Sequence, residues 1–527
     1  MVATLSTLFS ALFAATVLVQ TAVEARMVPG PEGMLWLRAQ AAQKQTVFSD
    51  PTCKAIQGVI SNASAIYAPG DAEYTKQIKH WCSSGDFYSK CSVEPATAAD
   101  VSAVLKVLGT SSSSFAVRGA GHSCAPGFSG SKGVNVAMTR FNEVTYNKAK
   151  GTVKYGSGLI WDQVYSALEP YDVKVVGGRV SGVGVAGFSL GGGYSFLTNQ
   201  YGVTSDGIVA YDFVTANGTV LYVTKQSYPD LFFLLQGGFN NAGIVMNFYV
   251  KARPRAKIWG GVLFLDGKSI DNVLNLTAQF ASEANTDPLG GLLPTIDAFA
   301  GIPLIECQIF YDNPNGPPNG SFVKNIFDQL MALPAVHQDV LPNRTMANFT
   351  AAAPASEFAG MRGTFSSVSL ERLTPEILQT IKEEFKFYGT LAPLGAGIFI
   401  SYDLEPFTRS ISYPAASSTG WPHSKQLSPL NLYFAWPLGL SDGLFYDAIR
   451  KSTNKIRQAA IAQGQNLDGL YLYPNYALYD TPLEDVYGPN VARLTQIAAK
   501  YDPSKVMARA GGFQFARGQN TYGVYGP

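Results

Sequence analysis

The glycine-rich run from Gly177 to Tyr194 restricts the fold of this chain more than any other feature. It holds eight glycines in eighteen residues, and glycine weakens helices and strands alike. A flexible linker is the plain alternative, but linkers rarely interleave Val, Phe and Leu with their glycines as this run does. Such a run lets backbone N–H groups face an extended ligand along its length. We therefore expect a loop that lies along such a ligand.

Two further glycine clusters accompany this run. Phe115-Ala116-Val117 reads as a strand and leads into Arg118-Gly119-Ala120-Gly121-His122-Ser123. Alternating glycines after a strand allow the backbone to approach a phosphate closely. His122 then lies where a diphosphate-bearing cofactor would bind, although a glycine-rich turn alone is more often just a turn. The third cluster spans 237–245.

Composition limits the remaining possibilities. A chain of 527 residues is too long for one simple core, so two domains are expected. The formal net charge is +1 and no basic run stands out, which argues against nucleic acid or an anionic membrane as the main partner. The four histidines stand in no close cluster with ligand spacing, so we predict no metal site.

The N-terminus is typical of a targeting segment. Residues Leu5 to Val19 are almost wholly apolar, and small residues follow at Val23 and Ala25. This stretch is shorter than a membrane span, so we predict a secretory signal over residues 1–25 and a secreted protein. An uncleaved N-terminal anchor is the alternative. Six Asn-x-Ser/Thr sequons agree with secretion; they lie at Asn62, Asn217, Asn275, Asn319, Asn343 and Asn348.

The rest of the chain divides into three parts. Residues 53–255 alternate short strands with helices, including a capped helix that starts at Thr97 and a helix over 161–168. Residues 256–455 carry longer polar helices and Pro-rich connections, which indicate an inserted α+β domain. From about Ala459 strong signals return, with an aromatic strand expected over 471–476 and a helix over 490–500.

Five ordered motifs together resemble the fungal berberine-bridge-enzyme-like flavoproteins of the vanillyl-alcohol-oxidase superfamily. The three glycine clusters are followed by Tyr473-Pro474-Asn475-Tyr476 and by a C-terminal set of short motifs; these are Tyr487-Gly488-Pro489-Asn490, Tyr501-Asp502-Pro503 and Gly511-Gly512-Phe513. The resemblance covers about residues 53–515. It implies an α+β fold with a two-part, PCMH-type FAD-binding domain, formed by 53–255 and the returning segment 456–520. An inserted substrate domain over 256–455, an antiparallel sheet covered by helices, would cover the flavin.

The resemblance also implies roles for individual residues. The loop Arg118, Gly119, Ala120, Gly121, His122 and Ser123 would cradle the FAD pyrophosphate. His122 would be joined covalently to the 8α carbon of the flavin; a free histidine that bonds a phosphate is the alternative. The other residues expected to contact the cofactor are Val180, Gly182, Val183, Gly187, Gly192, Gly193, Gly243, Ile244 and Asn475.

Two valines refine this prediction. Many members of the family carry a cysteine at the position of Val180 that forms a second bond to the flavin, so we expect a single covalent link here. Val183 occupies the position that gates oxygen, where valine accompanies oxidase behaviour and leucine accompanies dehydrogenase behaviour. O2 is therefore the expected acceptor and H2O2 the expected product. Simple packing of Val183 under the ring is the alternative.

The reaction needs a base that takes a proton while hydride moves to the flavin. The resemblance places Tyr476 and Tyr473 beside the reactive face. We predict Tyr476 as the base, with Tyr473 second and aromatic packing as the alternative for both. If 471–476 were a regular strand, Tyr473 and Asn475 would share one face and Tyr476 would lie on the other.

The sequence also allows predictions of the disulfide pairs and of the function of the protein. Of the five cysteines, Cys53 and Cys91 match a disulfide that is common in fungal relatives. Cys82 with Cys124 is a second candidate pair, which leaves Cys307 as the odd thiol. We predict a monomeric, secreted FAD-dependent oxidase of alcohols, either carbohydrates or secondary metabolites. A dehydrogenase with quinone-type acceptors, a biosynthetic ring-closing flavoenzyme and a non-catalytic flavoprotein are the alternatives.

Overall fold

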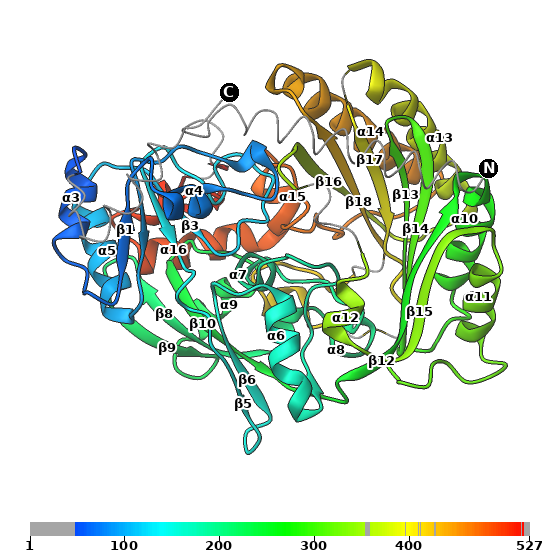
Figure 1. The fold of residues 1–527 in the computed structure, drawn as a ribbon, viewed down its shortest axis with the longest axis horizontal. Helices are drawn as coiled ribbons and strands as arrows, with labels where there is room; N and C mark the ends of the chain where they lie inside the picture. Colours follow the sequence, from blue (N-terminus) through cyan, green and yellow to red (C-terminus); the bar gives the residue numbers. More distant parts are fainter. Residues whose placement is uncertain are drawn as a thin grey trace, which may run out of the picture. The chain divides into compact units, whose positions relative to one another are not determined.

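The computed structural model describes residues 48–353, 359–395, 397–408, 411, 413–425, 428–517 and 519–520. The expected leader over residues 1–25 lies outside these ranges. Mixed helices and sheets make up the described part, as the α+β prediction requires (Figure 1). No helix in these ranges is long and apolar enough to span a membrane. No three His, Cys, Asp or Glu side chains in these ranges are grouped to hold a metal ion.

The first sheet carries the strand that leads into the Arg118–Ser123 loop. Within the described residues its order is β1-β2-β4-β3, with β4 parallel to both of its neighbours. Thr97 caps helix α5 as predicted, since its hydroxyl accepts from the Asp100 amide at 3.1 Å. Elements of this part are α3 (Pro51–Gln57), β1 (Ala65–Tyr67), α4 (Ala72–Ile78), β2 (Cys91–Glu94), α5 (Ala98–Thr110), β3 (Phe115–Arg118) and β4 (Val134–Ala137).

A second, antiparallel sheet follows in the order β5-β6-β10-β8-β9. The Asn217-Gly218 turn joins β8 to β9, with Gly218 at a φ of 86°. Its strands are β5 (Val144–Asn147), β6 (Thr152–Gly156), β8 (Ile208–Thr215), β9 (Val220–Thr224) and β10 (Gly243–Lys251). Its helices are α6 (Trp161–Leu168), α7 (Val185–Leu190), α8 (Thr198–Tyr201) and α9 (Pro229–Leu235), and β7 (Val173–Lys174) pairs with β11 (Arg253–Pro254).

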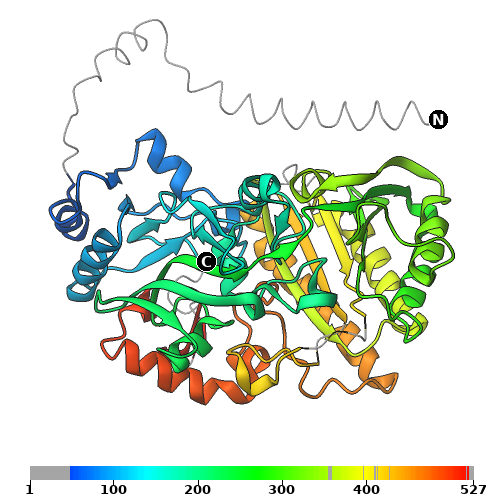
Figure 2. The same ribbon diagram turned by 90° about the horizontal axis from the view of Figure 1, so that it is seen from below.

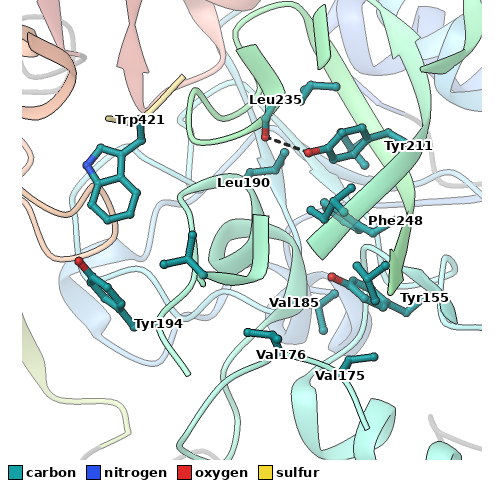
Figure 3. Packing of buried hydrophobic residues seen from close by; sticks show 14 of the residues in the cluster. Tyr155, Val175, Val176, Val185, Leu190, Tyr194, Tyr211, Leu235, Phe248 and Trp421 are labelled. Atoms are coloured by element: carbon teal, nitrogen blue, oxygen red, sulfur yellow. Dashed lines mark hydrogen bonds between the residues drawn. The ribbon is translucent and has the colours of Figure 1, made fainter. Parts of the chain in front are cut away.

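The glycine-rich run contains a helix, which the glycine content did not predict. Helix α7 forms because Val185 and Leu190, at its two ends, are buried in the core beside β6, β8 and β10 (Figure 3). Tyr155 and Phe248 stack at 5.3 Å in the same cluster, and the Tyr211 hydroxyl donates to the Leu235 carbonyl at 3.3 Å. Burial of two apolar side chains thus outweighs the helix-weakening effect of the glycines.

Residues 257–436 supply a larger antiparallel sheet, in the order β15-β12-β14-β13-β17-β18-β16 within the described residues. Helices α10, α13 and α14 pack on one face and α11 packs on α10 (Figures 1 and 2). The strands are β12 (Lys257–Asp266), β13 (Gly290–Phe299), β14 (Ile302–Tyr311), β15 (Ala335–Thr345), β16 (Arg362–Leu370), β17 (Phe399–Leu404) and β18 (Ser428–Trp436). The helices are α10 (Ile270–Phe280), α11 (Phe322–Met331), α12 (Met346–Thr350), α13 (Pro375–Leu391) and α14 (Asp442–Ala462).

The C-terminal segment returns to the first part of the chain. Helix α16 (Val491–Tyr501), red in Figure 2, packs against α9, and α15 (Leu483–Tyr487) precedes it. Phe513 and Phe515 lie in the same core as β6, β8 and β10. The predicted domain limits at 255 and 455 remain a prediction, although all seven strands of the large sheet fall between them.

Both cysteine pairings are as predicted. Cys53 is bonded to Cys91 and Cys82 to Cys124, while Cys307 is a buried free thiol.

Candidate active site

One cavity of about 410 Å³ joins the glycine loops to the large sheet. Loop residues 119–125 line one side together with Val180, Val183, Gly184, Ala186 and Gly187. Strands β13, β14, β16, β17 and β18 line the other side. Twelve of the predicted site residues lie on its wall: Gly119, Ala120, Gly121, His122, Ser123, Val180, Val183, Gly187, Ile244, Tyr473, Asn475 and Tyr476. The sequence motifs therefore converge on a single space.

The loop after β3 offers free donors to that space. The amides of Ala120, Gly121, His122 and Ser123 donate to no acceptor within the described residues. Gly121 takes a φ of 74°, where L side chains are strained, and a Cβ there would meet the Arg118 guanidinium at 2.6 Å. Unpaired N–H groups in a glycine loop form the kind of anion cradle that suits a diphosphate.

Arg118 has a supporting position behind this loop. Its guanidinium donates to the carbonyl oxygens of Lys79, Gly119 and Ala120 and does not line the cavity. Burial lowers the pKa of Arg118 to about 10. The side chain therefore holds the loop backbone in shape.

Four glycine positions of the prediction also stand back from the cavity wall. The Gly193 amide donates to the Tyr473 hydroxyl at 3.0 Å, and a Cβ on Gly192 would strike the Trp421 ring. The Gly182 amide donates to Asp162, and Gly243 begins β10 against Val214. A direct cofactor contact for these four and for Arg118 remains a prediction.

His122 projects from the donor loop into the cavity. Its ring stacks on Trp81 with centroids 4.8 Å apart and an interplanar angle of 22°. Burial lowers the pKa of His122 to about 4, because the surrounding protein disfavours the charged imidazolium. The imidazole is therefore neutral near pH 7, and one ring nitrogen holds a free lone pair.

The second loop packs closely against the first. A Cβ on Gly184 would come within 2.8 Å of the Ala120 methyl group, so the two loops touch only because residue 184 has no side chain. Val180 and Val183 face the cavity, and Gly187 has open space around its missing Cβ. The open space of the cavity therefore lies beside Gly187.

The expected strand over 471–476 is absent. Residues 474–476 form a turn in which the amides of Tyr476 and Ala477 both donate to the Tyr473 carbonyl. The turn brings Tyr473 and Tyr476 to the same cavity, with their rings edge to face at 4.8 Å. Proline at 474 disrupts strand pairing, and the alternation argument therefore does not apply.

Tyr476 belongs to a buried cluster with Arg179 and Glu405. Its hydroxyl donates to Glu405 Oε1 at 2.8 Å and accepts from Arg179 Nη2 at 2.9 Å. Arg179 Nη2 also donates to the same carboxylate oxygen at 2.8 Å. Burial alone would lower the pKa of Arg179, but the adjacent Glu405 carboxylate raises it above its usual value.

The two tyrosines differ in their surroundings. Burial raises the pKa of Tyr476 well above 10 and Glu405 raises it further, whereas Arg179 opposes the shift. Burial raises the pKa of Tyr473 to about 12, and its hydroxyl accepts from Asn475 Nδ2 at 2.7 Å. Only Tyr476 contacts a carboxylate that can receive its proton.

Sequence reasoning missed Arg179 and Glu405. Arg179 stands inside the glycine run, whose glycines carry the recognisable motif. Glu405 follows the last residue of β17. The alternation Ser401, Asp403, Glu405 was a readable signal of a polar strand face. Nothing in one sequence shows which way that face points.

Comparisons with known proteins agree with this geometry. A family model described as an FAD binding domain matches residues 89–224. The FAD-dependent monooxygenase drtC of Aspergillus calidoustus is 28% identical over 477 residues, which cover 86% of this chain and 88% of that protein. The structure of Physcomitrella patens BBE-like 1 aligns with a TM-score of 0.71 and 20% identity, over 87% of this chain and 97% of the other. The carbohydrate oxidase of Microdochium nivale aligns at 0.69 and 20% identity, over 86% and 98%.

The fold, the matched domain and the donor loop define an FAD-dependent oxidoreductase. Within that class, the chain has the same fold as Physcomitrella patens BBE-like 1 and the carbohydrate oxidase of Microdochium nivale. The free amides of the loop after β3, the neutral His122 and the space beside Gly187 fit a bound FAD.

Proposed function

We propose that the protein oxidises a substrate alcohol, with the flavin ring held between His122 and the Tyr476 cluster. The observation that carries this proposal is the chain of contacts from Arg179 and Tyr476 to Glu405 on the cavity wall. Bound FAD would accept a hydride from the carbinol carbon and pass the electron pair to O2, which leaves as H2O2.

Side chains of the protein accept and transfer the proton of the substrate hydroxyl group. Tyr476 already donates its hydroxyl proton to Glu405, so it can accept the substrate proton as its own proton moves to the carboxylate. The raised pKa of Tyr476 makes a resting tyrosinate unfavourable, which favours this relay over a free tyrosinate base. Arg179 compensates the negative charge that the buried cluster carries before the transfer.

His122 is proposed as the single covalent anchor of the flavin. A neutral imidazole with a free lone pair can form a bond to the ring, and Val180 at the cavity wall has no nucleophile to form a second. Denatured protein should show a flavin-fluorescent band in acid that disappears in His122→Ala. Persistent fluorescence in that variant would identify a different anchor.

The products formed from O2 distinguish an oxidase from a monooxygenase and from a dehydrogenase. The curated relative drtC is described as an FAD-dependent monooxygenase and the solved neighbour as a carbohydrate oxidase. An anaerobic flavin-bleaching screen over sugars, alcohols and amines identifies reducing substrates. Reoxidation under 18O2 should then release labelled H2O2 and leave the product unlabelled. Label in the product would indicate a monooxygenase, and fast dye reduction without peroxide would indicate a dehydrogenase.

Secretion also forms part of the proposal. Two disulfides in one chain suit an oxidising compartment. The asparagines of all six sequons are exposed, so glycosylation meets no steric obstacle. A mass decrease after glycosidase treatment of the protein from culture medium would support this localisation, and retention in the cytosol would contradict it.

A further inference from the structure

The wall of the cavity opposite the glycine loops is a row of polar side chains across four neighbouring strands. Asn431 on β18 lies opposite Asp403 on β17, Asp403 lies opposite Thr295 on β13, and Thr295 lies opposite Glu306 on β14. All four side chains line the cavity. Rigid strand register therefore fixes two carboxyl groups at either side of Thr295.

These carboxyl groups have no cationic partner of their own. Among the cavity-lining residues that the structure describes, Arg179 is the one Lys or Arg, and it is committed to Glu405 and Tyr476. Neither Glu306 nor Asp403 forms an ion pair within the described residues. Their hydrogen bonds come from neutral groups, namely Gln308 Nε2 to Glu306 at 3.0 Å and Asn431 Nδ2 to Asp403 at 2.6 Å.

The same wall carries buried acceptor atoms without a donor. Asn431 Oδ1 and Glu405 Oε2 have no hydrogen-bond partner within the described residues, although these residues are only 3% and 1% exposed. A buried polar atom left unpaired costs free energy, so such atoms at a cavity wall indicate a ligand that supplies donors. The wall therefore offers two acceptor atoms without a donor and two carboxyl groups without a cation of their own.

We propose that the substrate carries a protonated amine that binds between Glu306 and Asp403, while its carbinol carbon lies beside Tyr476. This inference rests on the proposed alcohol oxidation and adds the chemical class of the substrate. An ammonium group supplies three donors and the missing positive charge. A neutral polyol would satisfy the acceptors but leave the carboxylate charge buried and uncompensated.

The test compares two ligands of similar shape on the FAD-loaded enzyme. 4-(Aminomethyl)benzyl alcohol carries an ammonium group at pH 7.5, and 4-ethylbenzyl alcohol is its uncharged counterpart. Dissociation constants are measured anaerobically by stopped flow, from the dependence of the initial shift in flavin absorbance, before any bleaching, on the ligand concentration. We expect the ammonium ligand to bind about tenfold more tightly or better, which corresponds to about 1.4 kcal/mol.

Substitutions of the two carboxyl groups test whether these groups cause the preference for the ammonium ligand. Glu306→Gln and Asp403→Asn each should remove most of this preference while the affinity for 4-ethylbenzyl alcohol stays within about twofold. Glu143→Gln, an exposed glutamate, is the matched control and should retain the preference. Unchanged flavin spectra and a single cooperative thermal transition show that the variants are folded.

Three outcomes would overturn the inference: equal affinity for the two ligands, an equal loss of both affinities in the variants, or tighter binding of cellobiose than of the ammonium ligand. Failure of the proposed function looks different. In that case the ammonium ligand still binds preferentially, but neither alcohol bleaches the flavin.

Discussion

At the scale of single residues, buried carboxyl groups determine what the cavity can do. The Glu405 carboxylate accepts hydrogen bonds from both Arg179 and Tyr476. Glu306 and Asp403 are buried without a cation, and burial raises their pKa values to about 7 and about 6. The cavity wall thus holds one carboxyl group that is paired with Arg179 and two that are close to titration at neutral pH.

Replacement of Glu405 by glutamine tests the proton relay. The amide cannot receive the Tyr476 proton, so we expect the rate of anaerobic flavin reduction to fall about a hundredfold to ten-thousandfold. Stopped-flow absorbance with a substrate from the bleaching screen measures this rate. Glu143→Gln should match the unmodified enzyme, and a loss below about fivefold in Glu405→Gln would remove Glu405 from the relay.

Replacement of Glu306 by glutamine should change how stability depends on pH. The pKa of Glu306 is raised above its unfolded value by burial, then by the charge of Asp403, while Gln308 lowers it. Asp297, also buried, faces the same cluster. A carboxyl with a raised folded pKa contributes stability at low pH and loses it as the pH rises through the window between the two values.

Between about pH 5 and pH 8 the stability of Glu306→Gln relative to the unmodified protein should increase, by at most about 3 kcal/mol. Thermal unfolding at several pH values measures this difference. A constant difference across the range would show that Glu306 titrates normally.

Individual residues of the candidate site could be predicted from the sequence only where they belong to a recognisable motif. His122 and Tyr476 stand in motifs, and the structure places both at the cavity. Glu405, Asp403 and Glu306 come from strands whose facing direction depends on sheet register, and register is set by contacts between distant segments. No local pattern in the chain carries that information.

At the scale of elements, the Cys82–Cys124 disulfide fixes the donor loop. Cys124 stands two residues after His122, and Cys82 follows Trp81, whose ring stacks on His122. The disulfide therefore links the two segments that carry the stacked rings of Trp81 and His122. The Cys53–Cys91 bond instead joins α3 to β2, away from the cavity wall.

The two disulfides provide a matched comparison. They close loops of similar length, with sequence separations of 42 and 38, so removal of either should cost a similar 2–4 kcal/mol, roughly. Only Cys82→Ser/Cys124→Ser should also lower the fraction of covalently bound flavin, since His122 loses its fixed position. Acid fluorescence per mole of protein measures that fraction. An equal loss in Cys53→Ser/Cys91→Ser would assign the effect to stability alone.

Elements with a strong local pattern were predicted well. The helix over 161–168 has the predicted bounds because its apolar spacing and its burial agree. The segment 471–476 was misassigned because its aromatic content favours a strand while Pro474 and burial of both tyrosines favour a turn. Helix α7 was missed because tertiary burial decides its structure.

At the scale of the whole molecule, the C-terminal segment packs against parts of the chain that lie far away in the sequence. Asn241 donates to the Phe513 carbonyl at 2.8 Å and accepts from the Phe515 amide at 3.1 Å. Phe513 in turn packs edge to face on Phe128, close to the donor loop. The buried Asn241 side chain therefore helps to hold the returning segment expected from the resemblance, in addition to the core contacts of that segment.

Asn241→Ala tests this closure. The change leaves a buried carbonyl and a buried amide without partners, so we expect a loss of about 2–3 kcal/mol and a lower FAD content in the purified protein. Thermal unfolding and the ratio of flavin to protein absorbance measure both effects. Asn325→Ala, on the exposed face of α11, serves as the control and should change neither. Unaltered stability in Asn241→Ala would show that core packing alone secures the segment.

The cavity wall draws residues from Trp81 to Gly512, nearly the whole described chain. During synthesis from the N-terminus, the donor loop emerges hundreds of residues before the turn at Tyr473–Tyr476 that faces it. The cavity is therefore completed only after most of the chain has been synthesised, and a chain that stops before this turn would carry the donor loop without the residues that enclose the cavity with it.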